Sequence, residues 1–174
     1  MMTDVTREDE VLERLGALSS PRGFFMETVS IITDGVEHLI RSAFRQDDYA
    51  VKYAIEPLLN RQGPLSELPV RLKLLLGLGM ISLNTYQDLE LFIRLRDWLC
   101  ESRQDYRFSD PALLDRLQAL HGLQLEGLPL LTAPVAADPL LAAMQLERQD
   151  QMVRSSLLLC VSALVLELAK ESPI

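Results

Sequence analysis

Residues 138–170, DPLLAAMQLERQDQMVRSSLLLCVSALVLELAK, decide the fold class of this chain. Asp138 and Pro139 are typical of a helix start, because aspartate caps a helix and proline fits its first position. The first half of the segment mixes apolar and polar residues, whereas residues 157–168 are apolar almost all round. A helix without a polar face is normally buried. The segment therefore predicts a long C-terminal helix that is largely buried and, in its second half, central.

Working back along the chain, apolar residues recur at helical spacing. Ser20 and Pro21 begin a long helix whose apolar stripe follows a 4-3-4-3-4 spacing, at Phe25, Val29, Ile32, Val36, Leu39 and Ala43. No segment alternates between apolar and polar residues, as a half-buried strand does. The prediction is an all-α fold, a single-domain bundle of about seven helices that spans residues 1–174.

The helix boundaries are predicted from capping residues. Residues 1–19 hold a short first helix that Thr6 caps, and residues 121–137 form an irregular connection rich in leucine and proline. The remaining helix starts are the capping residues Asp47, Ser66, Asn84 and Asp110. Pro57 predicts a kink or an early stop near Glu56, and Gly79 is the expected C-terminal glycine of the helix that follows Ser66.

The charge balance argues against a protein whose affinity comes from phosphate contacts. The 174 residues include 17 basic and 25 acidic side chains, which gives a net charge of −8. Five arginines follow a carboxylate by four positions, the favourable order for ion pairs on a helix surface: Glu10/Arg14, Glu37/Arg41, Glu67/Arg71, Glu90/Arg94 and Asp150/Arg154. A helix-turn-helix at residues 50–81 is disfavoured, because its second helix is almost all leucine after Lys73.

The sequence predicts a cytoplasmic protein that makes no contact with a membrane. The first 13 residues carry five carboxylates against one arginine, unlike a secretory signal. The longest uncharged apolar run, between Arg154 and Glu167, has 12 residues, fewer than the about 20 that span a bilayer. Cys100 and Cys160 lie in apolar helical patterns, so both are expected to be free and buried.

No enzyme motif is found, and no cofactor or metal is expected. Asp34 and His38 share a helix face, but two ligands do not make a metal site, and no third ligand lies nearby in the sequence. His38 can also be read as a phospho-accepting histidine, or simply as an exposed one. Residues 77–79, Gly-Leu-Gly, follow a helix rather than a strand and lack the lysine of a phosphate loop, so a helix end is the favoured reading.

One stretch carries a family resemblance. It runs DDYAVKYAIEPLL at 47–59, GPL at 63–65, VRLKL at 70–74 and GLG at 77–79. This combination closely resembles the central segment of the mannitol operon repressor family of bacterial regulators. Further similar segments are residues 91–99 with Tyr106 and Phe108, and residues 143–155. The resemblance covers roughly residues 10 to 170.

The resemblance implies an all-helical cytoplasmic regulator that lowers expression of a mannitol uptake and utilisation operon. It supplies no catalytic residues and no recognised DNA-binding motif. We expect indirect repression through another protein, either a transcription factor or a sugar-uptake component. The alternatives are a repressor that binds operator DNA itself, a regulator of another pathway, and a phosphotransfer module that uses His38.

Two further expectations concern surfaces. The polar residues of the segment that carries the resemblance are the candidate partner-binding residues: Asp47, Asp48, Lys52, Glu56, Arg71 and Lys73. The alternative for each of them is a purely local role, as a helix cap, as a member of an ion pair on a helix surface or as a solvated charge. A homodimer is expected, because the last helix is longer than a domain of this size usually needs, and because Met144, Leu146 and the leucines of 122–137 offer apolar surface that a single copy does not fully cover.

Overall fold

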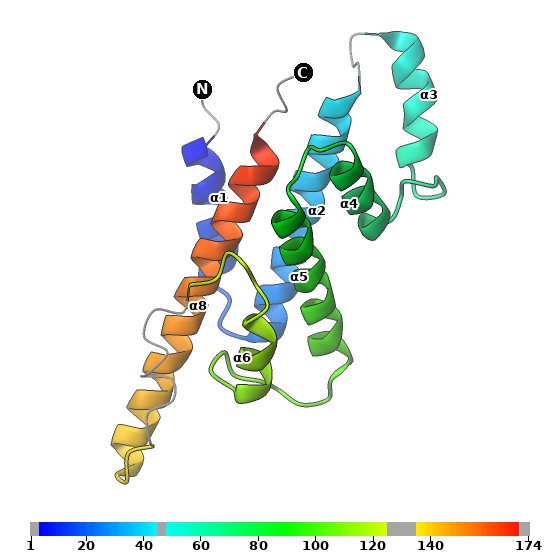
Figure 1. Cartoon of the computed structure of the whole chain (residues 1–174). Helices are drawn as coiled ribbons and strands as arrows, with labels where there is room; N and C mark the ends of the chain where they lie inside the picture. Colours follow the sequence, from blue (N-terminus) through cyan, green and yellow to red (C-terminus); the bar gives the residue numbers. More distant parts are fainter. Residues whose placement is uncertain (1–3, 45–47, 125–134, 171–174) are drawn as a thin grey trace.

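The structure, a computed structural model, describes residues 4–44, 48–124 and 135–170, and in these ranges it holds seven helices and no strand. The helices are α1 (Asp4–Gly16), α2 (Pro21–Ala43), α3 (Tyr49–Leu59), α4 (Leu68–Gly77), α5 (Leu83–Glu101), α6 (Pro111–Leu117) and α8 (Pro139–Ala169) (Figure 1). The all-α prediction is confirmed. Part of the irregular connection predicted at 121–137, residues 125–134, lies outside the described ranges.

Helix α2 occupies the centre of the bundle and packs against α1, α4, α5 and α8 (Figure 1). Its predicted apolar stripe is buried from Phe25 to Leu39, whereas Ala43 at its end is half-buried. Aromatic rings pack α2 against its neighbours. The ring centroids of Phe25 and Phe92 of α5 are 5.7 Å apart, and those of Phe24 and Phe108 are 5.5 Å apart. These contacts make α2 the helix on which the core is assembled.

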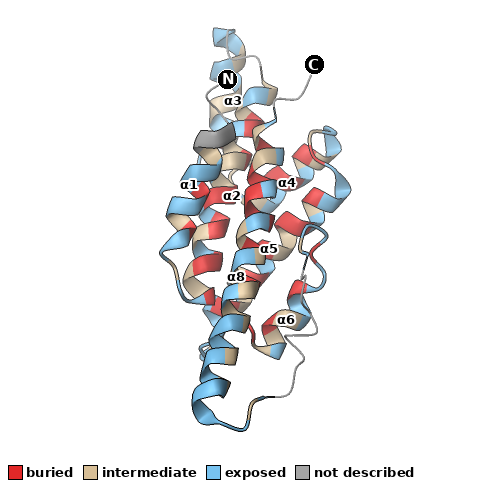
Figure 2. Cartoon of the chain, turned by 90° about the vertical axis from the view of Figure 1, so that its left-hand side faces the viewer, coloured by how far each residue is buried: buried red, intermediate tan, exposed pale blue. Residues whose placement is uncertain are grey.

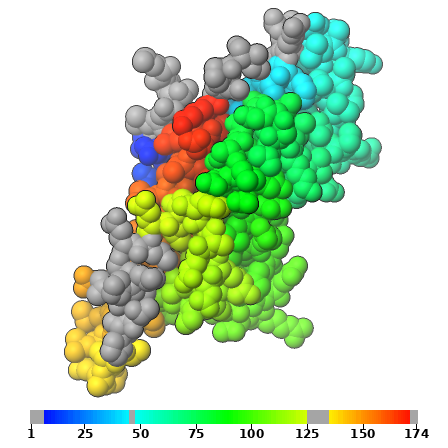
Figure 3. Space-filling view, in the orientation of Figure 1, coloured from blue at the N-terminus to red at the C-terminus, as the bar shows by residue number. Residues whose placement is uncertain are grey.

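Helix α8 is buried only in its second half. Its buried residues begin at Val153 and continue to Leu168, where the helix packs on α1 and α2. Its first half extends beyond the rest of the bundle and is mostly exposed (Figures 2 and 3). The prediction of a central last helix therefore holds for the second half alone, and α2 is the more central element. By length and composition α8 is the one described helix apolar enough to cross a membrane, a test that the core helix of a bundle also passes.

Several predicted helix boundaries are wrong by a few residues. Helix α1 begins at Asp4, so Thr6 lies inside it. The caps of α3, α4 and α5 are Asp48, Glu67 and Ser82 rather than Asp47, Ser66 and Asn84. For α5 the physical reason is clear, because the Ser82 hydroxyl accepts a hydrogen bond from the Thr85 amide at 3.1 Å.

Two predicted helix ends differ in outcome. Helix α3 carries Pro57 inside its last turn and continues to Leu59, so of the two outcomes predicted near Glu56 the early stop is wrong, and the kink stays a prediction. Helix α4 ends as expected, because Gly79 follows it with a φ of 69°. Only glycine adopts that left-handed conformation without strain.

Three arginines cap the C-terminal ends of helices other than their own. Arg154 of α8 donates to the carbonyls of Leu15 and Leu18 at the end of α1. Arg22 of α2 donates to the carbonyls of Leu99 and Ser102 at the end of α5. The third is Arg71 of α4, which caps α3. The last carbonyls of a helix have no partner within it and lie at the negative end of its dipole, so a guanidinium stabilises them.

Candidate partner-binding surface

Helix α3 stands apart from the bundle, at the far end of α2 (Figure 1). Among the described helices it shares no extended packing interface with any other, and its one buried residue is Leu59. An ion pair of 2.7 Å between Glu56 of α3 and Arg41 of α2 links it to the bundle. Helix α3 therefore presents most of its circumference to solvent.

Two tyrosines dominate the exposed side of α3. Tyr49 and Tyr53 lie one turn apart and are 81% and 75% exposed. Aromatic side chains are enriched where proteins bind one another, because each supplies a large contact area at a small cost in conformational entropy. Sequence reasoning missed these residues because it selected only the polar members of the segment. The usable signal was their spacing of four, which places both rings on one helix face.

The predicted contact residues fall into different environments. Lys52 and Lys73 are exposed. Asp48 caps α3 by accepting from the amides of Ala50 and Val51 at 2.9 and 3.4 Å. Asp47 lies outside the described residues, and Glu56 is half-buried in the ion pair described above. The structure thus leaves the lysines open and gives Asp48 and Glu56 local partners.

Arg71 is the exception within the predicted set, because it is only 7% exposed. Its Nε donates to the Leu65 carbonyl at 2.6 Å, and its Nη2 donates to the Leu59 carbonyl at 3.0 Å. These bonds join α4 to the end of α3 and to the turn between the two helices. Arg71 therefore holds the α3–α4 unit together from within, and we leave it out of the contact surface.

The arginines of this chain are largely committed to intramolecular partners. Of the 14 arginines, nine have a hydrogen bond, ion pair or ring contact with another described residue: Arg14, Arg22, Arg41, Arg71, Arg94, Arg96, Arg107, Arg116 and Arg154. Arg71 and Arg154 are occupied by backbone carbonyls inside the fold, whereas exposed pairs such as Glu90/Arg94 partly neutralise their arginines at the surface. This finding adds to the argument from net charge against direct DNA binding.

The predicted helix-surface ion pairs are present in three cases out of five: Glu10/Arg14, Glu37/Arg41 and Glu90/Arg94. The other two arginines are the helix caps Arg71 and Arg154, which donate to carbonyls instead. Asp150 is engaged elsewhere, by Arg107 and by the Ser109 amide at 2.8 and 3.0 Å. Sequence spacing found the right helix faces but could not show that tertiary acceptors compete for these arginines.

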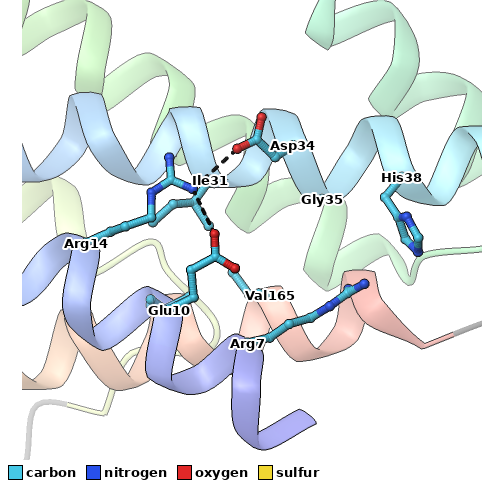
Figure 4. Close-up of a pocket in the computed structure, with 9 residues that line it drawn as sticks. Arg7, Glu10, Arg14, Ile31, Asp34, Gly35, His38 and Val165 are labelled. Atoms are coloured by element: carbon cyan, nitrogen blue, oxygen red, sulfur yellow. Dashed lines mark hydrogen bonds and ion pairs between the residues drawn. The ribbon is translucent and has the colours of Figure 1, made fainter. Parts of the chain in front are cut away.

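The face shared by Asp34 and His38 lines a groove between α1, α2 and α8 (Figure 4). Arg14 lies at one end, where its Nη1 is 3.3 Å from Asp34 and its Nε is 2.6 Å from Glu27. The hydrogen bonds to these carboxylates raise the pKa of Arg14 against the opposing effect of burial. Among the described residues no group of three or more histidine, cysteine or carboxylate side chains is arranged to hold a metal ion.

The second histidine, His121, pairs with Asp88 of α5. Its Nδ1 lies 2.8 Å from the Asp88 carboxylate, which also accepts from the amides of His121 and Gly122 at 2.9 and 3.0 Å. Asp88 is buried. A buried carboxylate with two backbone donors fixes the turn after α6 in place. The pair is therefore an anchor for this turn.

Both cysteines are free, as expected, but only Cys160 is buried. Burial, together with the charge of Asp88, raises the pKa of the Cys160 thiol to about 12. Cys100 is exposed near the end of α5, so the expectation that it is buried is wrong. Its apolar neighbours Trp98 and Leu99 face the bundle, whereas position 100 is turned outward.

The fold and this surface define an all-helical protein with solvent-facing aromatic residues and internally bound arginines, a class suited to protein contacts. The chain belongs to the mannitol repressor family, because the sequence model of that family matches residues 7–169. It is 43% identical to the mannitol operon repressor of Escherichia coli K12 over 158 residues, which are 91% of this chain and 80% of that protein. The resemblance inferred from the sequence is confirmed.

Two further comparisons bear on function. The X-ray structure of the MtlR–HPr complex from Escherichia coli contains a chain similar to this one, with a TM-score of 0.86 and 40% identity over 95% of this chain and 99% of that one. A protein of Shigella flexneri named fumarase E is 31% identical over 117 residues, 67% of this chain and 69% of that protein. The first relative is found with a protein partner, and the second carries the name of an enzyme.

Proposed function

We propose that this chain represses a mannitol operon indirectly, by binding another protein, and that HPr is that partner. The observation that carries the proposal is the similarity, at a TM-score of 0.86, to the chain found in the MtlR–HPr complex. The internal commitment of nine arginines, together with the net charge of −8, supports a protein partner over operator DNA.

The contact surface of this proposal is the exposed face of α3 together with Lys73 in the middle of α4. It combines Tyr49 and Tyr53 with Lys52 and Lys73, and Asp48 and Glu56 border it. Buried aromatic anchors supply most of the binding energy of a typical interface, whereas rim charges mainly steer association. The tyrosines are therefore the anchors, and the lysines attract an acidic patch on the partner.

Calorimetric titration of HPr into the purified chain tests this assignment. The variant is Tyr49→Ser with Tyr53→Ser, and the matched control is Leu159→Ser, since Leu159 is an exposed apolar residue of α8 at 72% exposure. We expect the double variant to lose affinity by at least about tenfold while it melts at the same temperature as the native chain. Native affinity in the double variant would refute the α3 surface. No binding of HPr by the native chain would refute the choice of partner.

The chain is further proposed to be a homodimer that uses the first half of α8. Leu140, Leu141 and Met144 are 69%, 55% and 60% exposed on the part of α8 that extends past the bundle (Figure 2). Burial of this apolar surface against a second copy removes it from water. Sedimentation should give twice the 19.6 kDa mass of one chain, and Leu140→Glu with Met144→Glu should return the mass to that of a monomer. A native monomer at micromolar concentration would contradict the proposal.

We further propose that the chain acts in the cytoplasm and has no enzymatic activity. The family description supports both, since it names a repressor. The similarity to fumarase E is the one observation on the other side, and a direct assay decides it. Purified protein should leave the absorbance of fumarate unchanged. Hydration of fumarate that is lost in His121→Ala would overturn the non-enzymatic proposal and make the Asp88–His121 pair its site.

A further inference from the structure

The groove between α1, α2 and α8 has two chemically different ends (Figure 4). Its volume is about 200 Å³. At one end Glu10 and Asp34 flank Arg14, and both carboxylate side chains remain largely exposed, at 62% and 68%. Carboxylates that keep lone pairs free are good acceptors for hydroxyl groups. This end of the groove can therefore bind a ligand rich in hydroxyl groups.

The other end of the groove carries positive or hydrogen-bond-donating groups. Arg7 extends from α1 toward the end where His38 of α2 lies (Figure 4). Neither side chain has a hydrogen bond or ion pair with another described residue, so both differ from the nine committed arginines. A guanidinium and an imidazole that approach from two helices form a site for an anion with several oxygens, and phosphate is the anion that arginine binds best.

The floor of the groove is apolar and closely packed. Val11, Ile31 and Val165 line it from three helices, and Gly35 lies between the two ends. A Cβ atom at Gly35 would lie 3.2 Å from Leu168, so the glycine lets α2 and α8 approach each other there. A firm floor that holds the two polar ends at fixed positions favours a ligand of defined length.

From these features we propose that the groove binds a small phosphorylated sugar alcohol, with the phosphate at Arg7 and His38 and the hydroxyl groups at Asp34 and Glu10. The proposal rests on the proposed function in one respect, the choice of mannitol as the sugar alcohol. A ligand here contacts α1, α2 and α8 together, and the ion pair between Arg41 and Glu56 links α2 to α3. Occupation of the groove is thus the means by which the metabolic state acts on the repressor.

Calorimetry on the isolated chain, without HPr or DNA, tests the site independently of the partner. The titrants are mannitol 1-phosphate, mannitol and inorganic phosphate. We expect mannitol 1-phosphate to bind in the micromolar to low millimolar range, and each of the other two to bind at least about tenfold more weakly. Equal affinity for inorganic phosphate would overturn the sugar-alcohol assignment. No binding of any titrant would overturn the site itself and leave the HPr proposal untouched.

Two variants and one control locate the ligand. The double variant Arg7→Ala with His38→Ala should lower the affinity for mannitol 1-phosphate at least about tenfold. The control Arg103→Ala removes an exposed arginine elsewhere and should leave that affinity unchanged. Asp34→Ala should lower the affinity for mannitol 1-phosphate and leave the weak binding of inorganic phosphate unchanged. Arg14 keeps its 2.6 Å contact with Glu27 in that variant. Unchanged affinity in the double variant, with a native melting temperature, would place the ligand elsewhere and refute the proposal.

Discussion

Replacement of Arg71 by alanine distinguishes a structural role from a contact role. The native side chain makes two hydrogen bonds from a charged donor, to the carbonyls of Leu59 and Leu65, at a position that is 7% exposed. A hydrogen bond to a charged group contributes about 1.5–3 kcal/mol to stability. In the alanine variant the two carbonyls lose their donor and regain part of that free energy by binding water. We therefore expect a loss of about 3 kcal/mol in the free energy of unfolding.

The assay is thermal and urea unfolding of the native chain and three variants in parallel. For a chain of 174 residues, a loss of about 3 kcal/mol lowers the melting temperature by about 6–12 °C. Lys73→Ala is the matched control, because Lys73 lies two residues away on the same helix and is exposed; it should change the free energy of unfolding by less than about 0.5 kcal/mol. Arg71→Lys should be intermediate, since an ammonium group does not reproduce the forked geometry of the guanidinium.

One outcome would refute this reasoning. If Arg71→Ala melts as the native chain does and yet fails to bind HPr, Arg71 acts at the contact surface, as its position in the sequence motif predicted. Hydrogen exchange supplies a second readout, because loss of the cap should release the amides of α3 before those of α2.

Four further predictions concern Asp88, the two cysteines and Arg154. Asp88→Asn should lower the free energy of unfolding by about 1–3 kcal/mol in urea unfolding, because an amide has one acceptor oxygen where the carboxylate has two, and its NH₂ then faces the backbone N–H of either His121 or Gly122. One thiol per native chain, that of Cys100, should react with a disulfide reagent at pH 8, and two should react after denaturation. The raised pKa of Cys160, about 12, also favours the folded state below the ordinary thiol pKa, and this contribution is lost as the pH rises toward 12. Arg154→Met should lower the melting temperature and release the amides of α1 in hydrogen exchange, because the last carbonyls of α1 lose their donor.

The all-α class and the buried faces could be predicted from the sequence because they depend on periodicity. The spacing of Phe25, Val29, Ile32 and Leu39 fixes which side of α2 faces inward, whatever the neighbouring helices are. The start of α8 after Asp138 and the end of α4 before Gly79 could likewise be predicted, because both depend on local sequence alone. Each depends on a residue type whose backbone preference is strong.

The roles of individual charged residues could not be predicted, because they depend on tertiary neighbours. Arg71 and Arg154 each follow a carboxylate by four positions, yet both donate to the carbonyls of another helix instead. The exposure of Tyr49 and Tyr53 depends on the separation of α3 from the bundle, which is a tertiary property and leaves no periodic signal in the sequence. Periodicity alone does not show whether an apolar face has a partner.

The central claim, repression through a protein partner, is tested most directly by a gel shift of the purified chain with mannitol promoter DNA at physiological salt. Direct operator binding would require a positive surface and an affinity that falls steeply with salt. With a net charge of −8 and nine arginines paired with other residues of the chain, we predict no specific complex at nanomolar protein. A specific complex at that concentration, competed by the same promoter and not by unrelated DNA, would contradict the account.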